Sequence, residues 1–205
     1  MKMEGLQFLN RLKDTSVSTC FFDPQYRGIL DKMKYGNEGK KRGKARASLK
    51  QMEASIIMNF IKEINRVLAN SGHLFLWIDK FHLCSGFDFW LDETELETVD
   101  MITWDKDRIG MGYRTRRQSE HLIVLQKKPK RAKGVWKSHT IPDVWREKIT
   151  EKKHTHSKPL ELQAQLITAV TSKGDWVIDP ASGSFSVLKA CQVTGRNFLG
   201  CDIRG

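Results

Sequence analysis

The sequence predicts an α/β protein in which a mixed, mostly parallel sheet carries helices on both faces. Apolar runs of strand length alternate with longer stretches in which apolar residues recur at helical spacing. Two of these runs end in short turns, Asp23-Pro24 and Asp179-Pro180, where such a sheet presents ligand-binding groups. The 205 residues, 40% hydrophobic and 29% charged, suit one globular domain with a sizeable core.

The N-terminal part of the chain predicts two helices and two strands. Apolar spacing predicts a short helix over residues 6–12, and residues 17–22 are β-prone and stop at Asp-Pro, as a strand does. Residues 48–68 show helical spacing, and we expect that helix to end at Asn70-Ser71-Gly72. Residues 73–78 form a nearly continuous apolar run, which is typical of a buried parallel strand.

The middle of the chain predicts a helix over residues 87–99 and strands over 101–104 and 120–126, joined by a glycine- and arginine-rich stretch. Residues 127–155 are basic and irregular in hydrophobic spacing, and they contain Trp136 and Trp145.

The C-terminal part predicts a helix over 160–170 that Pro159 opens, a strand over 176–178, a helix over 186–193 and a last strand over 197–201.

The charge balance predicts a polyanionic partner. The net charge is +11, and the basic residues gather in loop-like stretches. Because no basic amphipathic helix with a wide apolar face stands out, we expect DNA rather than a membrane as the partner. For any one basic cluster, the alternative is ordinary solvent-exposed surface. The candidate DNA-binding residues are Lys40, Lys41, Arg42, Lys44, Arg46, Arg114, Arg116, Arg117, Lys130 and Arg131.

Several classes of protein and site are not expected. The four cysteines show no C-x-x-C spacing, so reduced thiols are favoured over disulfides or zinc. No apolar run approaches the roughly 20 residues that span a bilayer, and residues 1–14 lack the apolar core of a secretory signal. We therefore expect a cytoplasmic, nucleoid-associated protein. His154 and His156 alternate without enough neighbouring ligands, so no metal is expected.

The turn near the C-terminus predicts a cofactor site. The segment Asp179-Pro180-Ala181-Ser182-Gly183-Ser184-Phe185 is a small-residue turn between a strand and a helix, and the next strand ends about twenty residues on, at Asp202. A carboxylate at Asp202 can accept ribose hydroxyls, and Asp179 can bind an amino group. Since G-x-G-x-x-G is absent, we expect an adenosyl amino acid rather than a dinucleotide; a tight structural turn is the alternative.

The turn near the N-terminus predicts a catalytic site, Asp23-Pro24-Gln25-Tyr26. Methyl transfer to an exocyclic amine requires the amine lone pair to face the methyl group. The Asp23 carboxylate and the Pro24 carbonyl can each accept one N–H, and proline fixes φ and pre-orients its carbonyl. Tyr26 can stack on a base that has left the DNA helix. An Asp-Pro turn after a buried strand is the alternative.

These segments, taken in order, resemble the beta class of amino-methylating DNA methyltransferases, in which the catalytic loop precedes the cofactor loop. Residues 23–26 resemble D-P-P-Y, and residues 179–185 resemble D-P-F-x-G-S-G. Ser157-Lys158 lie in a segment similar to H-P-T-x-K-P, and residues 198–202 resemble the ribose-binding strand. Further matches are residues 72–77 and 120–124.

The resemblance implies a Rossmann-like, S-adenosylmethionine-dependent methyltransferase fold, circularly permuted, with seven strands of which one is antiparallel. It implies a catalytic part (1–126), a short target-recognition insert (127–155) and a cofactor-binding part (156–205) of one domain. Phe22, Ser157 and Lys158 are expected to join the cofactor site, where Ser157 and Lys158 would bind the methionine carboxylate; an N-cap followed by an exposed lysine is the alternative.

The resemblance has departures. Gln25 replaces a proline, and Phe185 replaces a glycine of the cofactor loop, where it narrows the pocket or seals its floor. Few residues precede Leu6, so we expect a sheet that is one strand short or is completed by a partner, and a homodimer is plausible.

The sequence favours a site-specific adenine-N6 DNA methyltransferase that uses S-adenosylmethionine and base flipping. Aspartate rather than serine at position 23 favours adenine over cytosine N4. Cytosine-N4 or RNA methylation, and an inactive DNA-binding protein of the same fold, are the alternatives. Trp136 and Trp145 either contact bases or pack the insert.

Overall fold

The computed structural model describes residues 1–25, 52–110, 114–149 and 157–203. Within these residues one sheet of seven strands runs in the order β5-β3-β4-β2-β1-β6-β7. Strands β1 (Val17–Phe22), β2 (Leu68–Ile78), β6 (Trp176–Asp179) and β7 (Asn197–Gly200) are parallel neighbours. Strand β4 (Arg117–Lys127) is antiparallel to β2 and to β3 (Leu96–Gly110), and β5 (Val144–Arg146) is parallel to β3. One antiparallel strand among seven confirms the expected topology.

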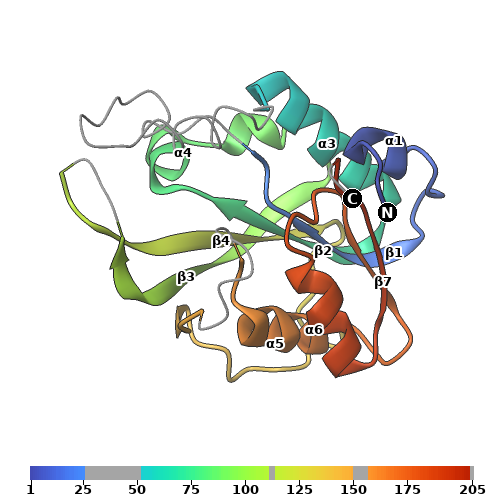
Figure 1. The fold of residues 1–205 in the computed structure, drawn as a ribbon. Helices are drawn as coiled ribbons and strands as arrows, with labels where there is room; N and C mark the ends of the chain where they lie inside the picture. Colours follow the sequence, from blue (N-terminus) through green and yellow to red (C-terminus); the bar gives the residue numbers. More distant parts are fainter. Residues whose placement is uncertain (26–51, 111–113, 150–156, 204–205) are drawn as a thin grey trace.

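Helices cover both faces of this sheet (Figure 1). Helices α1 (Gly5–Leu9) and α3 (Ala54–Val67) lie on one face, and α5 (Leu160–Val170) and α6 (Ser186–Thr194) lie on the other. Side chains alternate along β1, so Cys20 and Phe22 pack in the core beneath α1 and α3, whereas Phe21 packs in the core beneath α5 and α6. The doubly covered parallel strands explain the continuous apolar runs in the sequence.

The expected helix over residues 87–99 is wrong. A short 3₁₀ helix, η2 (Asp88–Trp90), is followed by the start of β3 at Leu96. The apolar residues at Phe87, Trp90 and Leu96 mimic helical spacing, but from Leu96 onward pairing of β3 with β4 prevails. The sequence also missed the short helix α4 (Lys80–Ser85), which Asp79 caps by accepting from two backbone N–H groups at 2.9 Å.

The bounds of α3, the helix that follows the Asp23-Pro24 turn in the chain, agree in part with expectation. Helix α3 ends at Val67 rather than at Asn70, and β2 begins directly at Leu68, with Ser71 inside this strand at φ 61°. The part of the expected helix over residues 48–51 lies outside the described residues.

The segment expected to be an insert packs against the sheet. Strand β5 adds to the edge of β3, and the Trp136 ring lies 5.8 Å from the His73 ring. Trp136 and Trp145 both pack against the core beneath α5, so the structure favours the packing alternative for these two rings. Glu147 in this segment caps α5 by accepting from the backbone N–H groups of Glu161 and Leu162, each at 3.0 Å.

The sheet is not a strand short. Strand β5 supplies the seventh strand, and Lys2 forms an isolated parallel bridge with Asp202 beside the end of β7. The Met3 N–H donates to the Asp202 carbonyl at 3.2 Å, and the Asp202 N–H donates to the Met1 carbonyl at 3.1 Å. Among the described residues, none of the helices has the length and apolar character needed to span a bilayer.

Candidate active site

The two predicted turns meet at one edge of the sheet. Strands β1 and β6 are parallel neighbours with Thr19 opposite Val177 and Cys20 opposite Ile178, so Asp23 and Asp179 emerge side by side. The chain leaves β1 towards α3 on one face and leaves β6 towards α6 on the other (Figure 1). This is a topological switch point, where open α/β sheets bind their ligands.

The turn after β6 is clamped between two strands. The Asp179 carboxylate accepts from the Ala181 N–H at 3.0 Å, and the Ser182 hydroxyl donates to the Asp179 carbonyl at 2.8 Å. The Ser182 N–H donates to the Cys201 carbonyl at 2.9 Å. Gly200 is required here, because a Cβ would lie 2.8 Å from the Asp179 carbonyl oxygen. The turn is therefore preorganised, with Gly183 exposed above it.

Negative charge accumulates in this corner. Asp179 is only 6% exposed. Burial raises the pKa of its carboxyl to about 7; the Ala181 N–H and Lys158 act to lower the pKa, while the carboxylates of Asp23 and Asp202 raise it further. A buried carboxylate in this state is stabilised by a cation, so the corner fits a ligand that carries an ammonium and a sulfonium group, as S-adenosylmethionine does.

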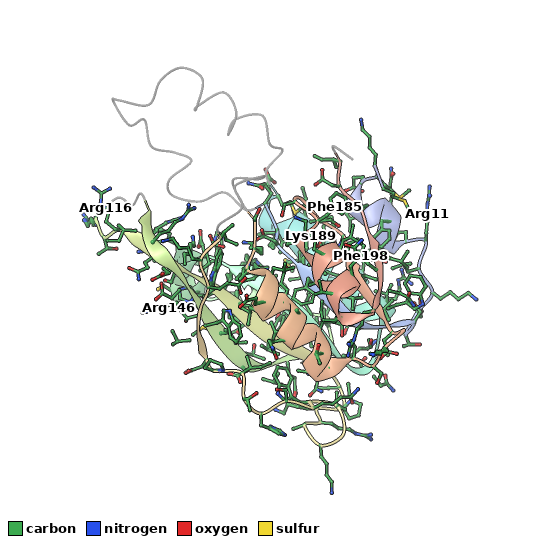
Figure 2. All side chains as sticks on the ribbon, turned by 60° about the horizontal axis from the view of Figure 1, so that its bottom comes forward. Arg11, Arg116, Arg146, Phe185, Lys189 and Phe198 are labelled. Atoms are coloured by element: carbon green, nitrogen blue, oxygen red, sulfur yellow. The ribbon has the colours of Figure 1, made fainter. Side chains whose placement is uncertain are left out.

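Phe185 ends the turn in a strained backbone conformation. Its φ of 55° lies in the left-handed region, which the glycine of the family motif adopts freely. Its ring packs edge-to-face on Phe198 of β7, with centroids 6.4 Å apart (Figure 2). The ring is therefore part of a two-phenylalanine wall beside the turn.

The Asp23-Pro24 turn is held by groups from other elements. The Asp23 side chain is 36% exposed, and its Oδ2 lies 3.0 Å from the Lys158 Nζ. Pro24 is buried, and the Gln25 carbonyl accepts from the Met52 N–H at 2.7 Å. Tyr26 lies outside the described residues.

The structure corrects the expectation for the Phe22 ring and the exposed-lysine alternative for Lys158. Phe22 is fully buried and stacks on Phe60 at 5.0 Å in the core beneath α3, so its ring offers a ligand no surface. Lys158 is not an exposed lysine: its side chain is 13% exposed, and it bridges Asp23 and Glu120. Ser157 precedes it and is half-buried.

Sequence reasoning missed the role of Glu120 in this site. Its Oε2 lies 2.8 Å from the Lys158 Nζ, and its Oε1 lies 2.6 Å from the Lys106 Nζ. Burial would raise the pKa of Glu120, but the two ammonium groups lower it to about 2. The sequence shows a charged residue at the start of an apolar strand, but no pattern in the neighbouring sequence indicates which residues it pairs with.

The basic residues divide between two edges of the sheet. Arg114, Arg116 and Arg117 lie where β4 begins, and Figure 2 labels Arg116 there. Because β4 is antiparallel to β2, this is the edge that carries Asp23. Arg117 lies over the Phe81 ring at 5.6 Å. Lys130 and Arg131 follow the other end of β4, at the opposite edge. Residues Lys40, Lys41, Arg42, Lys44 and Arg46 lie outside the described residues.

In the part of the chain that the structure describes, no cluster of three or more His, Cys, Asp or Glu side chains is arranged to hold a metal ion.

Comparison with known proteins agrees with this geometry. The N6/N4 methyltransferase family model, described as DNA methylase, matches residues 17–205. The chain is 59% identical over 203 residues to the type II methyltransferase M.HhaII of Haemophilus parahaemolyticus, covering 98% of this chain and 89% of that protein. It is 26% identical to M2.MboI of Moraxella bovis, over 96% of this chain and 80% of that protein.

Solved structures share the fold. The M1.HpyAVI complex with S-adenosylmethionine superposes with a TM-score of 0.68 at 19% identity, covering 97% of this chain and 90% of that one. The cytosine-N4-specific PvuII DNA methyltransferase gives a TM-score of 0.72 at 14% identity, covering 98% and 80%. The chain therefore belongs to the N6/N4 family of DNA methylases, S-adenosylmethionine-dependent enzymes that methylate amino groups of DNA bases.

Proposed function

We propose that this chain methylates the N6 amino group of adenine at a specific sequence in DNA. The observation that carries the proposal is the position of Asp23 beside Asp179 at the switch point, which brings an amine-binding corner next to a cofactor corner. Aspartate rather than serine at position 23 supports adenine as the target.

The residues of the catalytic turn orient the amine. The Asp23 carboxylate and the Pro24 carbonyl each accept one N–H, which leaves the nitrogen lone pair directed at the methyl group. Asp23 also stabilises the positive charge that develops on the nitrogen. Tyr26 stacks on the face of the flipped base.

The second corner holds the cofactor. Asp179 binds the ammonium group, Asp202 accepts the ribose hydroxyls, and the segment Pro180 to Ser184 lets the ligand approach the backbone. The Phe185 and Phe198 rings form the apolar wall. S-adenosylmethionine, when bound, supplies the electrophilic methyl group.

The DNA lies against the β3–β4 hairpin in this proposal. Arg114 and Arg116 are exposed at the edge that carries Asp23, which suits contact with phosphates. Lys130 and Arg131 are not part of the proposed DNA-binding face, because they lie at the opposite edge of the sheet. The Lys130 Nζ also lies 3.5 Å from the Glu97 Oε2. A homodimer remains a prediction.

The test is methyl transfer with labelled cofactor and mixed-sequence DNA. We expect labelled DNA that yields N6-methyladenine on nucleoside mass spectrometry. Asp23→Ala should abolish labelling while S-adenosylhomocysteine still binds, and the exposed Asp92→Ala should be unaffected. Robust labelling by Asp23→Ala would overturn the assignment. N4-methylcytosine as product, or labelling of RNA alone, would replace the proposed substrate, and no cofactor binding would favour an inactive DNA-binding protein.

A further inference from the structure

A chain of four alternating charges leads from the catalytic turn to the β3–β4 hairpin. The Asp23 Oδ2 lies 3.0 Å from the Lys158 Nζ, which lies 2.8 Å from the Glu120 Oε2. The other Glu120 oxygen lies 2.6 Å from the Lys106 Nζ. Two carboxylates and two ammonium groups balance, and the four come from four separate segments of the chain.

Two tryptophans form the floor of this charge chain. The Lys158 Nζ lies 4.6 Å from the centre of the Trp77 ring, and the Lys106 Nζ lies 5.5 Å from the Trp104 ring. The two rings meet edge-to-face at 5.9 Å, and both are buried. The lysines are therefore fixed by cation–π contact from below as well as by the carboxylates.

Because it is partly buried, the charge chain differs from a set of surface ion pairs. The side chains of Lys158, Lys106 and Glu120 are 13%, 17% and 33% exposed. Exposed pairs contribute little because water screens them, whereas a partly buried charge network holds its geometry. Burial acts to lower the pKa of Lys158, yet the carboxylates of Asp23 and Glu120 raise it, so this residue stays an ammonium.

The Lys158 ammonium is already committed to two carboxylates. A methionine carboxylate bound to the same ammonium would lie close to the Asp23 and Glu120 carboxylates, both of which repel it. In contrast, a lysine bonded to Oδ2 of Asp23 fixes the plane of the carboxylate that receives the amine of the base.

We propose that Lys158, Glu120 and Lys106 are positioning residues that hold Asp23 in its amine-binding orientation, and that Lys158 does not bind the cofactor carboxylate. This inference rests on the proposed function of Asp23. A small misplacement of a reacting group lowers a rate by up to about a hundredfold, so the charge chain has a measurable effect without touching substrate.

Lys158→Met removes the ammonium and keeps the stem over Trp77. We expect the single-turnover methylation rate to fall about tenfold to a hundredfold. Because Lys158 also acts to lower the pKa of Asp179, binding is measured at about pH 8.5, where the Asp179 carboxyl is ionised. Dissociation constants for S-adenosylhomocysteine and for 5′-methylthioadenosine, which lacks the amino-acid part, should both stay near wild type at this pH. A Lys158→Met variant that loses affinity for S-adenosylhomocysteine alone at this pH would show that Lys158 binds the carboxylate, and would overturn the inference.

Glu120→Gln and Lys106→Met test the outer links and keep the inference falsifiable if Lys158→Met does not fold. Each should slow the single turnover by about tenfold without changing either dissociation constant. The Lys158→Met/Glu120→Gln double variant should be no slower than Lys158→Met, because residues that act as a unit are not additive. Glu93→Gln is the matched control, since it breaks the exposed Lys62–Glu93 pair of 2.6 Å.

The failures of the two proposals are distinguishable. If Asp23→Ala abolishes methylation while Glu120→Gln, Lys106→Met and any folded Lys158→Met keep the wild-type rate, the charge chain does not position Asp23 and the proposed function stands. If Asp23→Ala remains active, the proposed function itself fails.

Discussion

The raised pKa of Asp179 predicts how cofactor affinity changes with pH. This pKa is about 7 in the free protein, against 3.8 for an unperturbed aspartate. Because an ammonium binds the ionised carboxyl, the ligand must displace a proton below pH 7. Each pH unit below 7 should therefore weaken binding by up to tenfold, or about 1.4 kcal/mol, and affinity should level off above pH 7.

Isothermal titration calorimetry with S-adenosylhomocysteine from about pH 5 to 8.5 measures this directly. Repeating the titration in buffers of different ionisation enthalpy should reveal close to one proton released per ligand at low pH and none above pH 8. Asp179→Asn keeps the size of the side chain and an acceptor for Ala181, so it should bind more weakly and without this pH dependence. 5′-Methylthioadenosine, which has no ammonium, should bind independently of pH.

The same group makes the free protein less stable as pH rises. The folded state holds the Asp179 proton more tightly than the unfolded chain, so stability is greatest below pH 4 with respect to this group and is lost between about pH 4 and pH 7, by at most about 4 kcal/mol. Asp179→Asn should remove this loss from the pH profile of urea unfolding. A flat affinity profile in the wild-type protein, or the same profile in Asp179→Asn, would refute the reasoning.

Three further predictions follow from the described geometry. Phe185→Gly and Phe185→Ala both lose the contact with Phe198, but only glycine adopts the left-handed backbone without strain. The free energy of unfolding measured in urea should therefore be about 1 kcal/mol higher for Phe185→Gly than for Phe185→Ala, and equal values would show that the backbone there is not strained. Glu147→Ala removes the cap of α5 and should lower the free energy of unfolding by about 1–2 kcal/mol, whereas an unchanged midpoint would mean that the cap is dispensable. Arg116→Ala should reduce the slope of log affinity for DNA against log salt by about 1, while Lys130→Ala at the other edge should not; the reverse pattern would place DNA on that edge.

Much of the architecture was predictable because it depends on local pattern. Strand β1 and helix α5 have the predicted bounds, since one ends at an Asp-Pro turn and the other begins after Pro159. The convergence of Asp23 and Asp179 also followed from the sequence, because parallel strands present their carboxyl ends at one edge. The error at residues 87–99 arose because apolar residues three and six positions apart satisfy a helix or an irregular turn before a strand.

Residue order determined the fold class, the two turns and the family of this protein, since each is encoded by spacing within a short stretch of chain. Only the tertiary structure decided which charges meet. Lys158, Glu120 and Lys106 are far apart in sequence, and no local rule pairs them; packing on Trp77 and Trp104 brings them to Asp23. The pKa of Asp179 is likewise a tertiary property, because burial raises it and the carboxylates of Asp23 and Asp202, which follow two other strands, raise it further.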